Sequence, residues 1–186
     1  MPDHKPSAQL STRRVYDGRI LDVDIDRVRF PDGSEGELEM VRHSGASAVL
    51  PFLSDPTGED PQILLIRQYR YAAEDFVYEI PAGRLDDGED PADCATRELR
   101  EETGCTASGV ERLTTIFTTP GFTDEKIHLF LATGLTQGEH AREKDEFLEA
   151  VPMPLSRALA MIESGEIVDS KTVVAILFAA GFRAGL

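Results

Sequence analysis

Three glutamates at helical spacing, at the end of a glycine-containing loop, constrain this chain more than any other feature. Glu98, Glu101 and Glu102 lie three and four residues apart, so a helix brings them together on its surface. Like charges at this spacing destabilise an isolated helix unless cations occupy the space between them. Carboxylate oxygens suit hard divalent ions, and Mg²⁺ is commonly held by one or two carboxylates together with substrate phosphates. The same spacing is also typical of a solvated charged face with weak ion pairs.

The segment that carries these glutamates has the end signals of a helix. Asp90 is a favourable N-cap, Pro91 suits the first helical position, and Asp93 adds negative charge to the first turn. Gly104 stands where a left-handed residue commonly ends a helix. The sequence therefore predicts a helix between Pro91 and Gly104.

The apolar residues of this helix form one narrow stripe at about 100° per residue. Glu98 and Glu102 lie on one flank of the stripe, and Glu101 is further round. Such a helix can bury one face while it presents its carboxylates at the edge of a cleft. The stripe consists of Ala92, Ala95 and Leu99.

The full spacing of this segment resembles the Nudix hydrolase box. In that box a glycine is followed after five residues by a glutamate, and after seven more by Arg-Glu-aliphatic-x-Glu-Glu-x-Gly-aliphatic. The one departure is Cys105, which stands where a larger aliphatic residue is commoner, and cysteine packs as a small hydrophobe. The matching positions are Gly83, Glu89, Arg97, Glu98, Leu99, Glu101, Glu102 and Gly104.

Length and composition fit one compact enzyme domain. The chain has 186 residues, of which 41% are hydrophobic and 28% charged, which is ordinary for a soluble globular protein. No apolar run is long enough to cross a bilayer, and residues 1–10 lack the apolar core of a signal peptide. The formal charge of −15 argues against polyanionic partners, so we expect no nucleic-acid partner and no membrane partner.

The two cysteines of the chain indicate the redox state of its cellular compartment. Cys94 and Cys105 follow no metal-ligand pattern, and we expect them to be reduced packing residues in a cytoplasmic protein. A disulfide between them is the alternative.

The N-terminal quarter of the chain is expected to form a separate small sheet. Residues 1–10 are expected to be a disordered end, and residues 11–44 an antiparallel β meander whose strand over 21–30 alternates apolar and polar residues. Such a meander is too small to be stable alone and needs a partner surface. In related enzymes the N-terminal strands pack on a second subunit, so the resemblance implies a homodimer. Tyr16 or Phe30 could then stack on the nucleobase.

Residues 45–186 are expected to form the Nudix hydrolase domain. The resulting fold class is α/β, by resemblance a Nudix-type α/β/α sandwich with a mixed sheet, preceded by the small N-terminal antiparallel β meander. A helix starts at Leu155 or Ser156 and ends near Gly165, and Asp169-Ser170 caps another. The expected strands cover residues 48–53, 63–66, 76–80, 112–118, 127–132 and 147–151.

Four segments, outside the box or leading into it, narrow the resemblance. Leu65–Arg70, Glu79–Gly83 and Pro120–Glu125 look like the ADP-ribose pyrophosphatase subfamily, and so does Asp169-Ser170-Lys171-Thr172. The resemblance implies hydrolysis of ADP-ribose to AMP and ribose 5-phosphate. Hydrolases of other nucleoside diphosphate sugars, such as GDP-mannose, share many of these features. A non-catalytic nucleotide-binding module is the alternative from a different class.

The family's metal site maps onto named residues of the box. Glu98 and Glu102, joined by the backbone carbonyl of Ala82, are the implied ligands of Mg²⁺, with Mn²⁺ possible in its place. Glu101 is either a third ligand or a base just outside the ligand shell. Glu89 and Arg97 are expected to hold the loop and the helix together by ion pairing.

The remaining site residues lie outside the box or at its edge. The resemblance implies a general base on a late loop, where Glu146 fits best and Glu143 is the runner-up. Arg70 is the expected contact to a substrate phosphate, because its fork suits bidentate recognition. Glu125 matches a position near the terminal ribose. Arg67 and Arg84 are the weaker substrate-binding candidates, since each could equally form a surface ion pair.

Overall fold

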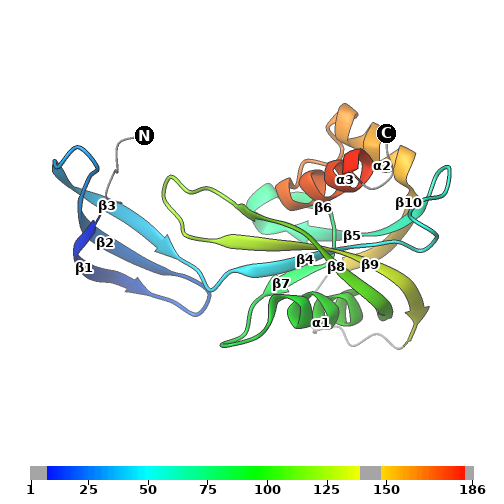
Figure 1. Ribbon diagram of the computed structural model, residues 1–186, viewed down its shortest axis with the longest axis horizontal. Helices are drawn as coiled ribbons and strands as arrows, with labels where there is room; N and C mark the ends of the chain where they lie inside the picture. Colours follow the sequence, from blue (N-terminus) through cyan, green and yellow to red (C-terminus); the bar gives the residue numbers. More distant parts are fainter. Residues whose placement is uncertain (1–7, 139–147, 183–186) are drawn as a thin grey trace. The chain divides into compact units, whose positions relative to one another are not determined.

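A three-stranded antiparallel sheet forms the first of two compact units in the computed structural model, which describes residues 8–138 and 148–182. This unit comprises the chain up to Gly45 together with Phe117–Lys126. Its strands lie in the order β1-β2-β3 (Figure 1). They are β1 (Ala8–Asp17), β2 (Asp22–Arg29) and β3 (Glu35–Arg42).

Strand β1 begins earlier than the sequence suggests. Ala8 pairs with Arg29, so Ala8–Leu10 belong to the sheet although their composition is that of a chain end. The side chains of β1 are exposed along its whole length. Pairing of the backbone, which composition does not reveal, therefore extends the strand.

The buried positions of β2 are partly acidic. Asp24 and Asp26 are only 6% and 5% exposed, and both accept hydrogen bonds from Arg42. Arg14 donates a further bond of 2.5 Å to Asp24. The period-two alternation correctly predicts the strand, but its most covered face carries Asp24 and Asp26 together with Val28.

The second unit runs from Ala46 to Ile116 and resumes at Ile127. It contains a four-stranded sheet in the order β7-β4-β9-β8 and a three-stranded sheet in the order β10-β5-β6. Strand β4 pairs parallel with β9 and antiparallel with β7, so the larger sheet is mixed. The strands are β4 (Ala46–Pro51), β5 (Gln62–Arg70), β6 (Asp75–Glu79), β7 (Ala82–Arg84), β8 (Cys105–Phe117), β9 (Lys126–Gln137) and β10 (Leu148–Pro154).

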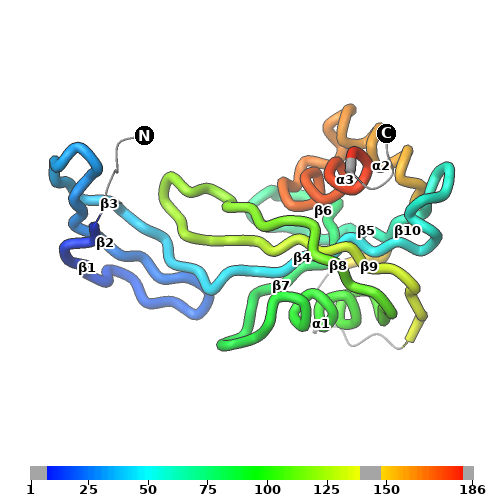
Figure 2. The backbone as a smooth tube through the Cα atoms, viewed as in Figure 1, coloured from blue at the N-terminus to red at the C-terminus, as the bar shows by residue number. Residues whose placement is uncertain are grey.

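Helices cover both sides of these strands. Helix α1 lies on one side, and α2 and α3 lie together on the other (Figures 1 and 2). This is the expected α/β/α sandwich. The helices are α1 (Pro91–Thr103), α2 (Leu155–Ser164) and α3 (Ser170–Phe182), and a 3₁₀ turn, η1 (Tyr71–Ala73), joins β5 to β6.

Strand β4 is the centre of the hydrophobic core because both of its faces are covered. Ala48 and Leu50 pack in the cluster that includes residues of α2 and α3. Val49 packs with Leu99 of α1 in the second cluster. Successive side chains of a strand point to opposite faces, so a sheet between two helical layers needs apolar residues at both.

The helix ends are confirmed. Asp90 accepts a hydrogen bond from the backbone N–H of Ala92 at 2.8 Å, and Gly104 adopts the left-handed φ of 73°. Helix α2 ends before Gly165, whose φ is 81°. Asp169 accepts a bond from the N–H of Thr172 at 3.0 Å in the first turn of α3.

The two strands after α1 are longer than their apolar runs. β8 begins at Cys105 rather than near residue 112, and β9 continues to Gln137 rather than ending near residue 132. Their outer parts are polar or half-exposed, so the hydrophobic pattern marks only the covered stretch of each strand.

Two further expectations concern the thiols and the membrane. Cys94 and Cys105 are both free and buried, as predicted. Among residues 8–138 and 148–182, no helix has the length and apolarity needed to span a bilayer.

Candidate active site

Helix α1 places the carboxylate of Glu98 directly against the backbone of strand β7. Gly83 lies in β7, paired with Ser47 of β4. A Cβ atom at Gly83 would come within 1.9 Å of the Glu98 carboxylate oxygen Oε1. A side chain at this position would therefore displace the Glu98 carboxylate.

Glu102, one turn further along α1, contacts the same stretch of backbone. Its Oε2 accepts a hydrogen bond from the N–H of Ala82 at 3.0 Å. Glu102 is 2% exposed and Glu98 is 8% exposed, so both are more deeply covered than carboxylates at the open edge of a cleft. Two carboxylates of α1 and the Ala82–Gly83 backbone thus meet in one place.

This donor set fits a hard divalent cation. Carboxylate and backbone carbonyl oxygens are the ligands that Mg²⁺ takes in proteins, and substrate phosphates commonly complete its shell. The Gly83 position leaves room for the Glu98 carboxylate beside the Ala82 peptide. Within the described ranges, no three His, Cys, Asp or Glu side chains form a ready-made metal cage. Two carboxylates and one backbone carbonyl leave positions in the shell of such a cation for substrate phosphates.

Arg97 ties the loop to the helix, as its predicted structural role requires. Its Nε and Nη2 donate to the two carboxylate oxygens of Glu89 at 2.9 and 3.0 Å. Its Nη1 donates to Glu98 at 2.5 Å and to Glu101 at 3.2 Å. The hydrogen bonds from Arg97 outweigh burial and lower the pKa of Glu89 from its ordinary 4.5 to about 2.

Glu101 is the outermost of the three helix glutamates. Its side chain is 27% exposed, against 10% for that of Glu98. It bonds to Arg97, and its Oε1 lies 4.0 Å from Arg100. Its role as a third ligand or a base stays a prediction.

Arg70, the expected phosphate contact, forms a bidentate pair with a buried carboxylate. Its Nε and Nη2 donate to Oε1 and Oε2 of Glu79 at 2.6 and 2.8 Å. These bonds raise the pKa of Arg70, and the nearby negative charges of Glu102 and Asp169 raise it further. Arg70 therefore lies within the electrostatic field of a box carboxylate.

Sequence reasoning missed the partner of Arg70. Glu79 is 2% exposed and also accepts a hydrogen bond from Lys171 of α3. Burial opposes ionisation of Glu79, but the hydrogen bonds from Arg70 and the charge of Lys171 hold its pKa below the ordinary value. Glu79 and Lys171 each lie in a segment that resembles the subfamily, but only the tertiary fold brings the two side chains together.

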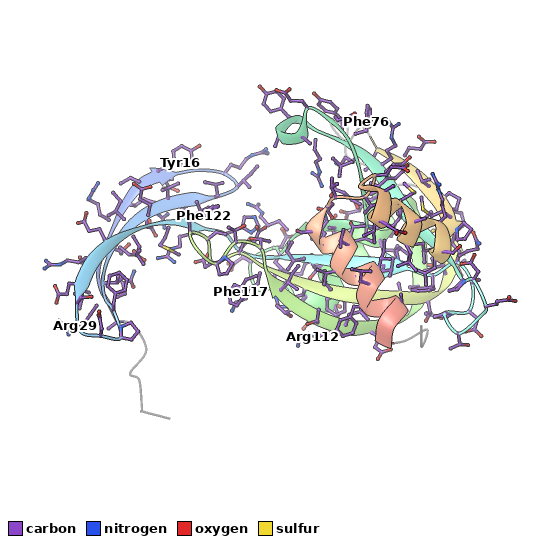
Figure 3. All side chains as sticks on the ribbon, turned by 90° about the horizontal axis from the view of Figure 1, so that it is seen from above. Tyr16, Arg29, Phe76, Arg112, Phe117 and Phe122 are labelled. Carbon is purple, nitrogen blue, oxygen red and sulfur yellow. The ribbon has the colours of Figure 1, made fainter. Side chains whose placement is uncertain are left out.

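Arg67 and Arg84 have different surroundings. The guanidinium of Arg67 lies over the ring of Phe76, 4.6 Å from its centroid, and that ring meets Tyr69 edge-on at 5.6 Å. Phe76 belongs to the hairpin formed by β5 and β6 (Figure 3). Arg84 is exposed, and its carbonyl accepts a hydrogen bond from Arg97 at 3.2 Å.

Glu125 belongs to the first unit. It accepts a hydrogen bond from the Thr118 hydroxyl at 2.9 Å, and its other carboxylate oxygen lies 3.4 Å from Nδ1 of His43. Tyr16, an expected stacking residue, is 57% exposed on β1 (Figure 3). Glu146 and Glu143 lie outside the described residues.

Comparison with known proteins shows which family this chain resembles. A family model described as NUDIX domain matches residues 43–173. The chain is 41% identical over 171 residues to the methanol dehydrogenase activator of Bacillus methanolicus, and 39% identical over 171 residues to the ADP-ribose pyrophosphatase of Bacillus subtilis. Each alignment covers 91% of this chain and 90% of the relative.

A more distant relative and a solved structure extend the comparison. The GDP-mannose pyrophosphatase of Cronobacter sakazakii is 35% identical over 152 residues, which cover 73% of this chain and 77% of that protein. A crystal structure of an ADP compounds hydrolase superposes with a TM-score of 0.81 at 23% identity, and covers 97% of this chain and 96% of its own. At that identity the match supports the fold alone. From the matched family model and the relatives of nearly equal length, we conclude that the chain belongs to the Nudix family and is a Nudix pyrophosphohydrolase.

Proposed function

We propose that this protein hydrolyses the pyrophosphate bond of ADP-ribose to AMP and ribose 5-phosphate, and that it requires Mg²⁺. The observation that carries the proposal is the meeting of Glu98 and Glu102 at the Ala82–Gly83 backbone. The substrate assignment is supported by the similarity to an ADP-ribose pyrophosphatase over nearly the whole chain.

In this proposal Glu98, Glu102 and the carbonyl of Ala82 would hold the cation. When bound, a divalent cation orients a diphosphate, neutralises part of its charge and lowers the pKa of water. Mn²⁺ could replace Mg²⁺, since both accept oxygen ligands. Arg97 and Glu89 keep the loop in place, so that the helix carboxylates and the Ala82 peptide stay together.

The protein's own groups then act on the substrate. Arg70 donates hydrogen bonds to the diphosphate, with Arg67 and Arg84 as further cationic contacts, and Glu125 accepts from hydroxyls of the terminal ribose. Water forms a bond to one phosphorus while the bond from that phosphorus to the bridging oxygen breaks. Glu146 takes the proton of the attacking water, with Glu143 as the runner-up for this role. Glu101 is either a third ligand of the cation or a base just outside its ligand shell.

A panel of nucleotide sugars tests the substrate. Each reaction yields phosphomonoesters, so we would measure phosphate released by an added phosphatase, in Mg²⁺, in Mn²⁺ and in EDTA. We expect ADP-ribose to have the highest kcat/KM, and EDTA to abolish turnover. A higher kcat/KM for another substrate would contradict the assignment of ADP-ribose.

Hydrolysis of GDP-mannose is the second candidate, favoured by the similarity to a GDP-mannose pyrophosphatase. The same panel separates it, because the ratio of kcat/KM values for the two substrates reports their difference in transition-state binding. The similarity to a methanol dehydrogenase activator raises a regulatory alternative. Nucleotide binding without turnover of any panel member would favour that alternative.

Two broader proposals complete the assignment. We propose a homodimer, because β1 is exposed along its length and presents Val15 and Tyr16, which are 46% and 57% exposed. We also propose a cytoplasmic location, because both buried cysteines are free thiols, as is typical of a reducing compartment.

A further inference from the structure

A fully covered carboxylate stands at the end of β6, outside the Nudix box. Glu79 is 2% exposed, and an unpaired charge at such a position would be strongly destabilising. Two cations meet it. Arg70 of β5 donates from Nε at 2.6 Å and from Nη2 at 2.8 Å, and Lys171 of α3 donates from Nζ to the same Oε2 that Nη2 contacts.

The pairing continues into the first turn of α3 and returns to the neighbour of Glu79. Lys171 Nζ lies 3.1 Å from Asp169, which also accepts the hydroxyl hydrogen of Thr172 at 2.6 Å. The Thr172 hydroxyl oxygen in turn accepts the buried N–H of Ile80 at 2.9 Å. A closed set of bonds therefore fixes the Glu79–Ile80 backbone to the start of α3.

This set of bonds fixes the orientation of Arg70. A guanidinium held at Nε and one Nη by both oxygens of a carboxylate has a defined plane, unlike the ammonium of a lysine. Glu79 does not engage Nη1 of Arg70, and the Arg70 side chain remains 44% exposed. The negative charge of Glu102 acts on the same guanidinium. Arg70 can therefore contact a diphosphate with its outer N–H groups while its inner ones are held.

We propose that Glu79, anchored by Lys171, is a positioning residue that aims the Arg70 guanidinium at the diphosphate of a nucleoside diphosphate sugar. The inference rests on the proposed function, which takes Arg70 as the diphosphate contact. A purely structural ion pair would instead stabilise the β6–α3 junction and would affect ligand binding independently of Arg70.

A double-mutant cycle separates these two roles. Its four proteins are the wild type, Glu79→Gln, Arg70→Ala and the double variant. Kd for ADP-ribose is measured by calorimetry in EDTA, where turnover is absent, and kcat/KM is measured in Mg²⁺. Loss of a charge-assisted contact in Arg70→Ala should weaken binding roughly tenfold to a hundredfold. Glu79→Gln should weaken ADP-ribose binding about tenfold, because the NH₂ group of the glutamine amide would then face Arg70 or Lys171 and could accept no hydrogen bond from it.

The decisive comparison is the double variant. If Glu79 acts through Arg70, adding Glu79→Gln to Arg70→Ala should change Kd by less than about twofold. Losses that multiply across the two single variants would overturn the proposal. Asp60→Asn serves as the control, because Asp60 accepts hydrogen bonds from Ser156 at the start of α2 and should change neither Kd nor kcat/KM.

A second variant guards against loss of folding. Glu79→Gln with Lys171→Met removes one charge of each sign, and so leaves Arg70 and Asp169 to balance each other. We expect this variant to show the same weakening of Kd as Glu79→Gln alone. Wild-type Kd in a variant whose thermal unfolding is cooperative would contradict the positioning role.

The cycle also distinguishes failure of the inference from failure of the proposed function. Turnover of ADP-ribose with multiplicative losses would contradict the inference alone. Coupled losses in Kd without turnover of any nucleotide sugar would contradict the proposed function alone. A wild type that binds no nucleotide sugar would contradict both.

Discussion

The three glutamates of the box have different surroundings although they share one helix. The carboxylate of Glu98 touches the Gly83 position and bonds to Arg97, while that of Glu102 bonds to the N–H of Ala82. Glu101 is more exposed and reaches the same Arg97. Because Glu98 and Glu102 contact the backbone of β7, substitution of either should lower turnover more than substitution of the more exposed Glu101.

Substitution of Glu102 tests the proposed metal site. Glu102→Gln keeps the shape of the side chain and removes its charge, so it should lower kcat/KM at saturating Mg²⁺ by at least about 10²-fold. Circular dichroism should report an unchanged fold. Unaffected activity would disprove the ligand assignment. Glu101→Gln on the same helix is the matched comparison.

Substitution of Glu146 tests the proposed base. Glu146→Gln should lower kcat by roughly 10²- to 10⁴-fold, as is typical when a general base is lost. KM should change much less, because no substrate contact is removed. Near-normal turnover of this variant, together with slow turnover of Glu143→Gln, would transfer the role to Glu143.

At the scale of elements, the proposed metal site is formed by β7, the loop after it and helix α1. Close packing at Gly83 and the ion pair of Arg97 with Glu89 hold these parts in register. Neither contact needs the substrate. We therefore infer that the box carboxylates are arranged before a nucleotide binds, which favours catalysis.

The Gly83 contact predicts a steric effect. Gly83→Ala would place a Cβ atom 1.9 Å from the Glu98 carboxylate, which must then move. Because the clashing atoms are the far end of a flexible side chain, the shift should cost little stability, but displacement of a proposed metal ligand should reduce turnover. Urea unfolding and steady-state kinetics measure the two effects. Gly58→Ala, where the nearest atom would be a carbonyl at 3.2 Å, provides a milder control; equal losses in both variants would contradict the steric reason.

The pair of Glu89 with Arg97 predicts a dependence of stability on pH. The pKa of Glu89 is lowered from 4.5 to about 2 in the folded protein, so its stabilisation is complete above pH 4.5 and is lost as the pH falls toward 2. Glu89→Gln should thus reduce the free energy of unfolding at pH 7 by about 1–3 kcal/mol.

Chemical unfolding at several pH values measures this effect. The difference between wild type and Glu89→Gln should narrow as the pH falls from 4.5 to 2. A difference that stays constant over this range would show that ionisation of Glu89 is not its source. Glu59→Gln, at an exposed position, serves as the control.

The sequence could predict features that depend on contacts between residues close together in the chain, but not contacts between distant elements. The ends of α1 were predictable because Asp90 and Gly104 act on backbone groups a few residues away. The spacing of the box likewise predicted the pairing of Arg97 with Glu89. The contact of Glu79 with Lys171 joins residues on β6 and α3, and no periodic pattern encodes it.

The limits of the strands were predictable only where the strand is buried. The apolar run over residues 48–53 predicted strand β4, because burial on both faces leaves a continuous hydrophobic signal. The first half of β8 is polar and half-exposed, so backbone pairing there leaves little trace in composition. The burial of Asp24 was also not predictable, since it depends on Arg14 and Arg42 from the neighbouring strands.

At the scale of the whole molecule, the exposed strand β1 predicts self-association. Light scattering coupled to size exclusion should give twice the chain mass of 20.5 kDa at micromolar concentration. Val15→Asp with Tyr16→Asp should shift the mass to that of the monomer, because two charges would then stand on the proposed interface. A monomeric wild type at assay concentration would contradict the homodimer.

The parallel pairing of β4 with β9 has a consequence for how the chain reaches its native state. Ala46 pairs with Ile127, so the whole loop and helix of the box lie between the two partners in the sequence. Closing so long a loop has an entropic cost before any of its contacts form, and folds dominated by such distant pairings fold slowly. During synthesis on the ribosome, β4 therefore cannot pair with β9 until the chain has emerged beyond Ile127. Until then its apolar side chains are exposed and can take part in aggregation.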